Sequence, residues 1–101
     1  MKDERRRYPR VVVNCAAKVF DLQRRLLVRG RTVDISAGGV KILGPTVNSP
    51  QAGAEVEVEI ELALPDSPRR RQVLRQATVR RVEAMGDWTA VALEFAKLVE
   101  V

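Results

Sequence analysis

The segment EVEVEIELAL, at residues 55–64, limits what this chain can fold into more than any other stretch. Its apolar side chains occupy every second position, and glutamates fill four of the positions between them. Side chains two residues apart lie on the same face of a β-strand, so the segment predicts a strand with one buried and one solvated face. Half-buried strands of this kind are typical of antiparallel sheets.

Five further segments show strand character, and turn-forming residues separate them. They lie at residues 11–20, 26–35, 39–43, 71–83 and 88–95. Within residues 26–35 the apolar side chains change face, which predicts a β-bulge near Gly30. Short strands at this spacing favour a closed barrel, because closure leaves no exposed strand edge. The predicted fold class is all-β, a six-stranded antiparallel barrel. Residues 96–101 fit either a short helix or a frayed end.

Length and composition limit the classes of function. A chain of 101 residues supports one compact core, and we divide it into a flexible segment at residues 1–10 and a barrel domain at residues 11–101. There is no histidine and a single cysteine, Cys15, which is expected to pack in the core. Without a catalytic triad or a zinc cluster, we expect neither an enzyme nor a bound metal or cofactor. No apolar stretch of about 20 residues and no signal peptide occur, which predicts a cytoplasmic protein without membrane insertion.

The segment RRRYPR, at residues 5–10, contains four arginines. Within residues 1–10, five basic side chains oppose two acidic ones, so the segment carries a net charge of +3 and has little to bury. Such a segment is expected to be mobile when no ligand is bound. Its guanidinium groups can fork onto the oxygens of a phosphate, or they can simply stay solvated. The segment alone leaves both interpretations open.

The segment DISAGG, at residues 34–39, joins two predicted strands. If Val33 and Ile35 point into the barrel, Asp34 and Ser36 project together from its outer face. A carboxylate in this position can accept both N–H groups on the pairing edge of a guanine. The two glycines allow positive φ angles and a close approach of a ligand to the backbone. The segment can therefore accept a guanine base, or it can simply link the two strands.

Simpler interpretations stand beside these. The serine and glycines of the DISAGG segment can form an ordinary turn, and Asp34 can pair with Arg31. Trp88 is expected to be partly buried at the barrel rim, although its ring can also stack on a guanine. A second group of arginines is expected mainly on solvated strand faces, in part paired with the glutamates of residues 55–61, although one of them can also reach a ligand or a negatively charged partner. Its members are Arg69, Arg70, Arg71, Arg75, Arg80 and Arg81.

Taken together, the two segments resemble the sequence motifs of PilZ domains. Arg6 and Arg10 have the spacing of the RxxxR motif, and residues 34–39 match the (D/N)xSxxG motif. The order of the motifs, the gap between them and the strand pattern that follows extend the resemblance over nearly the whole chain. The resemblance implies a PilZ-like barrel of the split-barrel type that binds cyclic di-GMP, a bacterial second messenger with two guanines and two phosphates.

The resemblance also implies roles for single residues. Arg6 and Arg10 would clasp phosphate and guanine, while the DISAGG segment would hold a guanine on the barrel surface. Arg5 occupies a position at which PilZ domains with an arginine tend to bind two stacked ligand molecules, so two per chain are favoured over one. The implied ligand-binding residues are Arg5, Arg6, Arg10, Asp34, Ser36, Gly38 and Gly39.

The predicted function is that of a cyclic di-GMP receptor in bacterial signalling. An anionic ligand would offset the repulsion among the arginines and order residues 1–10 against the barrel, and an unidentified downstream protein would recognise the changed surface. Two alternatives are a basic barrel that binds single-stranded nucleic acid and a PilZ-like interaction domain without a ligand. Nucleic acid is the less favoured partner, because the chain has few aromatic residues for stacking and a row of glutamates at residues 55–61.

Overall fold

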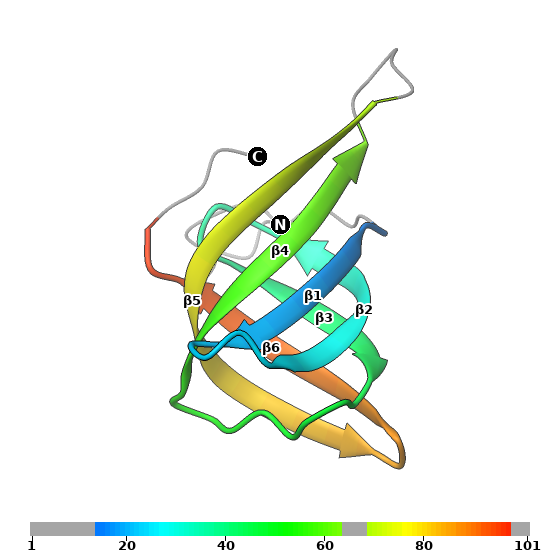
Figure 1. The fold of residues 1–101 in the computed structure, drawn as a ribbon, viewed down its shortest axis with the longest axis vertical. Coiled ribbons are helices and arrows are strands. Elements are labelled where there is room, and N and C mark those ends of the chain that lie inside the picture. Colours follow the sequence, from blue (N-terminus) through cyan, green and yellow to red (C-terminus); the bar gives the residue numbers. More distant parts are fainter. Residues whose placement is uncertain (1–13, 64–68, 98–101) are drawn as a thin grey trace, which may run out of the picture.

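The computed structural model describes residues 14–63 and 69–97. They form antiparallel strands that close into a barrel, in the order β1-β2-β3-β6-β5-β4 (Figure 1). The strands are β1 Ala16–Asp21, β2 Leu26–Ile35, β3 Gly39–Pro45, β4 Glu55–Ala63, β5 Arg70–Met85 and β6 Trp88–Phe95. These described ranges contain no helix, and hence none that could cross a membrane. The predicted fold class is confirmed.

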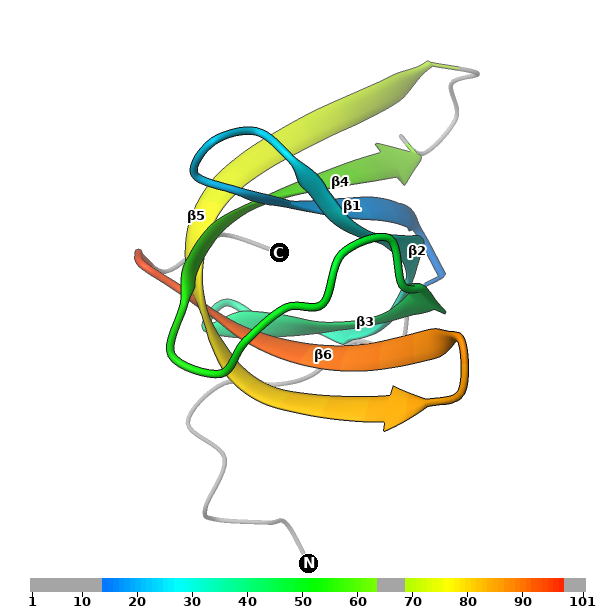
Figure 2. The same ribbon diagram turned by 60° about the horizontal axis from the view of Figure 1, so that its bottom comes forward.

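The long strand β5 joins the two sides of the barrel. Its first half pairs with β4 and its second half pairs with β6. Figure 2 shows this strand curving from the side of β1 and β4 to the side of β3 and β6. Because β1 pairs with both β2 and β4, the sheet closes on itself.

The predicted strand ends agree closely with the observed ones. β2 and β6 begin and end at the predicted residues, whereas β3 and β5 run beyond their predicted ends, to Pro45 and Met85. β1 begins at Ala16, inside its predicted range, of which residues 11–13 lie outside the described part of the chain. Residues 98–101 also lie outside it, so their predicted choice between a helix and a frayed end stays open.

The core consists of the inward positions of the strands. Along β4, Val56, Val58 and Ile60 are buried, as the alternating pattern predicts. The largest fully buried side chains are Ile42, Ile60, Val19, Val28, Val56, Val58, Val79 and Val91. All of them are β-branched, and such side chains fit the pleated surface of a buried strand. Cys15 is partly buried and packs against this core.

β2 contains two bulges and neither lies at Gly30: opposite β1, Leu27 is an extra residue, and the second bulge lies opposite β3. The register between β2 and β3 shifts between Thr32 and Asp34, so Val33 is the extra residue. Val33 is exposed at 39%, whereas Thr32 is buried. The predictions that Val33 points inward and that a bulge lies near Gly30 are therefore wrong. The glycine at 30 has another cause: a Cβ atom there would lie 2.1 Å from the carbonyl oxygen of Leu43, so only glycine lets β2 and β3 come this close.

The carboxylate of Asp21 holds the turn between β1 and β2. Its Oδ1 accepts hydrogen bonds from the backbone N–H groups of Arg25 at 2.8 Å and Gln23 at 2.9 Å. Its Oδ2 accepts from Nε of Arg25 at 2.7 Å. The backbone N–H of Arg25, with help from its guanidinium, lowers the pKa of Asp21. This turn lies at the end of the barrel opposite the DISAGG segment, since β2 runs from one to the other.

Candidate functional site

Asp34 lies on the outer wall of the barrel, near the end of β2. It pairs with Lys41 of β3, and the next residue along, Ile35, pairs with Val40. Both Ile35 and Val40 are buried in the core, and successive residues of a strand alternate between faces, so Asp34 points outward. Asp34 is thus on the face that the sequence predicts. The bulge at Val33 places it there, because regular alternation from the buried Thr32 would turn Asp34 inward.

Ser36 forms the turn that connects β2 to β3. Its backbone N–H donates to the carbonyl of Gly39 at 2.9 Å, and its hydroxyl oxygen accepts from the N–H of Gly38 at 3.2 Å. The simpler interpretation, an ordinary turn, therefore describes these residues correctly. The hydroxyl proton takes no part in the bond from Gly38, so Ser36 can still donate a hydrogen bond to a ligand.

The two glycines of the turn are tied to β6. The carbonyl of Gly38 accepts from the N–H of Phe95 at 2.9 Å, and a Cβ atom on Gly39 would lie 2.2 Å from the carbonyl oxygen of Leu93. Gly38 and Gly39 do not adopt the positive φ angles that glycine allows. The described glycines with positive φ lie in the turns before β4 and β6. The close approach of β6 is what requires glycine at position 39.

The described chain begins beside the end of β2. The N–H of Cys15 donates to Oγ1 of Thr32 at 2.9 Å, and the carbonyl of Cys15 accepts from the N–H of Thr32 at 2.8 Å. The guanidinium of Arg31 donates to the side chain of Asn14 and, at 3.0 Å, to its carbonyl. Arg31 therefore binds Asn14, and not Asp34 as the simpler interpretation has it.

Arg5, Arg6 and Arg10 lie outside the described residues. Arg10 comes four residues before Asn14 in the sequence, and four extended residues span at most about 14 Å. Since Asn14 lies beside the end of β2, the sequence separation allows Arg10 to reach Asp34. The grouping of the arginines with the DISAGG segment stays a prediction.

A row of outward residues lies in register with Asp34. Asp34 pairs with Lys41 of β3, Lys41 with Ala92 of β6, and Ala92 with Arg81 of β5. Directly paired residues lie on the same face of a sheet, so all four share the outer wall. The sequence placed Arg81 in a group of arginines expected mainly on solvated faces, of which one member can reach a ligand, and gave Lys41 no role. Their alignment with Asp34 depends on the pairing of strands that are distant in the sequence.

The ion pairs of the outer wall are exposed. Glu57 of β4 pairs with Arg24 in the β1–β2 turn, rather than with one of the arginines of residues 69–81. Arg80 donates from Nε to Oε1 of Glu94 at 2.5 Å. Exposed pairs of this kind contribute little to stability.

In the described ranges, no group of three potential metal ligands lies close enough together to hold a metal ion.

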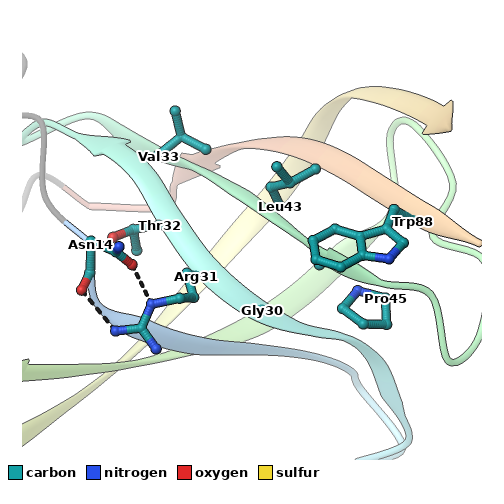
Figure 3. Close-up of a pocket in the computed structure, with 9 residues that line it drawn as sticks. Asn14, Gly30, Arg31, Thr32, Val33, Leu43, Pro45 and Trp88 are labelled. Atoms are coloured by element: carbon teal, nitrogen blue, oxygen red, sulfur yellow. Dashed lines mark hydrogen bonds between the residues drawn. The ribbon is translucent and has the colours of Figure 1, made fainter.

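A cavity of about 550 Å³ opens on the same wall, next to Asp34. Figure 3 shows the ring of Trp88 beside Pro45 at one end of this cavity and the side chain of Arg31 at the other. Val33, the bulged residue that precedes Asp34, also lines it. Trp88 is exposed at 48%, in line with the predicted partial burial at the rim. Because its lining is mainly apolar, the cavity suits a ring or an apolar side chain better than an isolated charge.

The fold is similar to those of solved PilZ-domain structures. It matches a structure of the inhibitor of motility MotI/DgrA from Bacillus subtilis with a TM-score of 0.74 and 24% identity, over 96% of this chain and 45% of that one. It also matches the PilZ domain of YcgR from Escherichia coli, solved with c-di-GMP, with a TM-score of 0.70 and 16% identity, over 92% of this chain and 79% of that one. The chain thus spans less than half the length of MotI/DgrA.

The sequence itself carries the family assignment. No curated protein matches it. Residues 4–100 match the family model of the PilZ domain, a range that includes the arginine-rich segment and every strand of the barrel. This chain therefore belongs to the PilZ domain family.

Proposed function

We propose that this chain is a receptor module for cyclic di-GMP, which it binds between residues 5–10 and the DISAGG segment. The observation that carries the proposal is the outward position of Asp34 next to the Ser36 turn, on the wall of a PilZ barrel. The similar PilZ domain of YcgR was solved with c-di-GMP, which supports the same class of ligand here.

The hydrogen-bonding groups of guanine suit Asp34 and Ser36. An ionised carboxylate only accepts hydrogen bonds, and the pairing edge of guanine presents two neighbouring N–H donors. In the proposed complex Asp34 accepts from both donors, and Ser36 donates its hydroxyl proton to the ligand. Gly38 and Gly39 present no side chain that would keep the base away from the turn.

The arginines supply the positive charge that the ligand phosphates require. Arg6 and Arg10 fork onto phosphate oxygens or onto O6 and N7 of a guanine. Arg5 contacts a second, stacked ligand, which gives two molecules per chain. Binding offsets the repulsion within residues 1–10 and holds them against the barrel. A downstream protein in the bacterial cytoplasm then recognises the changed surface, and no reaction is catalysed.

Titration of the intact chain with cyclic di-GMP, followed by isothermal calorimetry, tests this proposal. We expect saturable binding with two ligands per chain. Cyclic di-AMP has the same phosphates but lacks the two adjacent N–H donors of guanine, so it serves as the matched control. We expect it to bind at least about 100-fold more weakly, because it leaves the carboxylate of Asp34 without its hydrogen bonds.

Two outcomes would contradict the proposal. Equal affinity for the two cyclic dinucleotides would mean that no guanine edge is read. Binding to single-stranded DNA that is as tight as binding to cyclic di-GMP, and that weakens steeply with salt, would favour the nucleic-acid alternative.

Amide hydrogen exchange tests the ordering step separately. We expect the backbone N–H groups of residues 2–10 to exchange rapidly in the free chain and at least about 10-fold more slowly with saturating cyclic di-GMP, because ordered amides are protected. The β4 strand, whose exchange should not respond to the ligand, is the internal reference. Slow exchange of residues 2–10 before any ligand is added would exclude an ordering mechanism.

A further inference from the structure

Two basic side chains border a small residue in the row that begins at Asp34. Lys41 and Arg81 both pair with Ala92, one from each side. Neighbouring strands lie about 4.8 Å apart, so the backbones of the two basic residues are about 10 Å apart with only a methyl group between them. Neither forms an ion pair with another residue of the part of the chain that the structure describes. Two cations that have no ionic partner among the described residues therefore flank the small side chain of Ala92 on the outer wall.

The two outer strands of the row, β2 and β5, each contain a β-bulge next to the row. In β2, Val33 is the extra residue and precedes Asp34. In β5, the register shifts between Val79 and Arg81, so Arg80 is the extra residue. Val79 is buried, and strict alternation from it would send Arg81 into the core. The two bulges thus have the same effect, since each turns a charged side chain, Asp34 or Arg81, onto one outer surface.

The two adjacent arginines of the β5 bulge differ in their surroundings. Arg80 binds Glu94 at 2.5 Å, so a neighbouring carboxylate offsets its charge. Glu94 itself pairs with Gly39 of the DISAGG segment, which places this ion pair at the border of the row. Arg81 has no such partner among the described residues. Of the two, Arg81 is the one whose charge stays available to an anion.

We propose that Lys41 and Arg81 form an anion subsite that holds a phosphate of the cyclic dinucleotide. The subsite rests on the proposed function, because it uses the guanine held at Asp34 to set the position of the phosphate. Ala92 leaves room for the ligand to lie flat on the wall. Lys41 contributes a compact charge and Arg81 a planar fork that matches phosphate oxygens. The phosphate is then bound from the barrel side by Lys41 and Arg81.

A row across β2, β1 and β4 provides a matched control. Lys18 of β1 pairs with Arg29 of β2 and with Glu59 of β4, which makes a row with the same charges as Asp34, Lys41 and Arg81. That row has no small residue between its two basic members and no glycine turn beside its acid. Removing two positive charges there changes the net charge equally and leaves the proposed subsite intact.

The experiment compares Lys41→Gln/Arg81→Gln with Lys18→Gln/Arg29→Gln in calorimetric titrations with cyclic di-GMP at low and high salt. We expect the first double variant to bind about 10- to 100-fold more weakly and the second to change by less than about 3-fold, since direct bonds to phosphate outweigh screened, distant charges. The affinity of the first variant should also depend less on salt. Arg80→Gln should resemble the control, because Glu94 already offsets the charge of Arg80.

The outcomes separate the two proposals. An intact chain that does not bind cyclic di-GMP overturns both. An intact chain that binds, together with equal effects of the two double variants, overturns the subsite alone. All the replaced side chains lie on the outer wall, and thermal unfolding of each variant checks that the barrel is retained.

Discussion

Asp34→Asn is expected to weaken the binding of cyclic di-GMP by at least about 100-fold while the barrel stays folded. Asparagine has the same shape, but it replaces one acceptor oxygen with an NH₂ group that faces a guanine N–H donor. The variant therefore loses one charge-assisted hydrogen bond, and its NH₂ donor is placed against an N–H donor of the guanine. A bond of this kind contributes about 1.5–3 kcal/mol, and each 1.4 kcal/mol corresponds to about 10-fold in affinity. Calorimetric titration of the variant measures the loss.

The matched control for this prediction is Asp87→Asn. Asp87 is an exposed acid in the turn between β5 and β6, and the substitution changes the net charge by the same amount. It should leave the affinity within about 3-fold of that of the unaltered chain, since exposed and distant charges are screened. If both variants bind as the unaltered chain does, Asp34 does not read the guanine. Equal large losses would point to long-range electrostatics instead of direct contact.

The strands could be predicted because their signals are local. The alternation of Val56, Val58 and Ile60 with glutamates is present in the sequence itself, and turn-forming residues separate β2 from its neighbours. The short strands and the regular spacing of the turns between them indicated a closed barrel. The bulge at Val33 was misplaced because its position is set by the register with β3, and no pattern within β2 contains that register.

The residues of the candidate site likewise divide into those that a local sequence pattern groups and those that only strand pairing brings together. Asp34 and Ser36 belong to one short segment, so the sequence could group them. Lys41 lies two residues beyond Gly39 on the same strand face, and that spacing was a signal that could have been used. Arg81 could not be singled out among the arginines of residues 69–81, because it joins the row only through the β3–β6 and β5–β6 pairings and a bulge.

The chemistry assigned to Gly39 could not be foreseen either. A sequence shows that glycine is present but not which neighbour excludes a side chain. In the structure the neighbour is the backbone of β6, at Leu93, and not a ligand. The glycine of the family motif therefore has a role in the fold that is independent of any role in binding.

Gly39→Ala is accordingly expected to destabilise the barrel by about 3 kcal/mol, a large part of the roughly 5–15 kcal/mol typical of a domain. The added Cβ would lie 2.2 Å from the carbonyl oxygen of Leu93, and a backbone atom in a paired strand cannot move aside cheaply. The strain must be relieved by separating β3 from β6 next to the DISAGG segment. Urea unfolding followed by circular dichroism measures the change in the free energy of unfolding.

Gly53→Ala is the control for this prediction, because Gly53 has a φ of +90° and no atom within 4 Å of an added Cβ. Gly53→Ala therefore measures only the conformational cost of a side chain at positive φ, about 1–2 kcal/mol, without the cost of a steric clash. If Gly39 serves only to let a ligand approach, Gly39→Ala should keep the stability of the unaltered chain and lose binding alone. If the packing of β6 requires the glycine, Gly39→Ala should unfold at lower urea than Gly53→Ala even without ligand. Comparing the urea unfolding midpoints of Gly39→Ala and Gly53→Ala therefore shows whether Gly39 is required for the stability of the barrel or only for ligand binding.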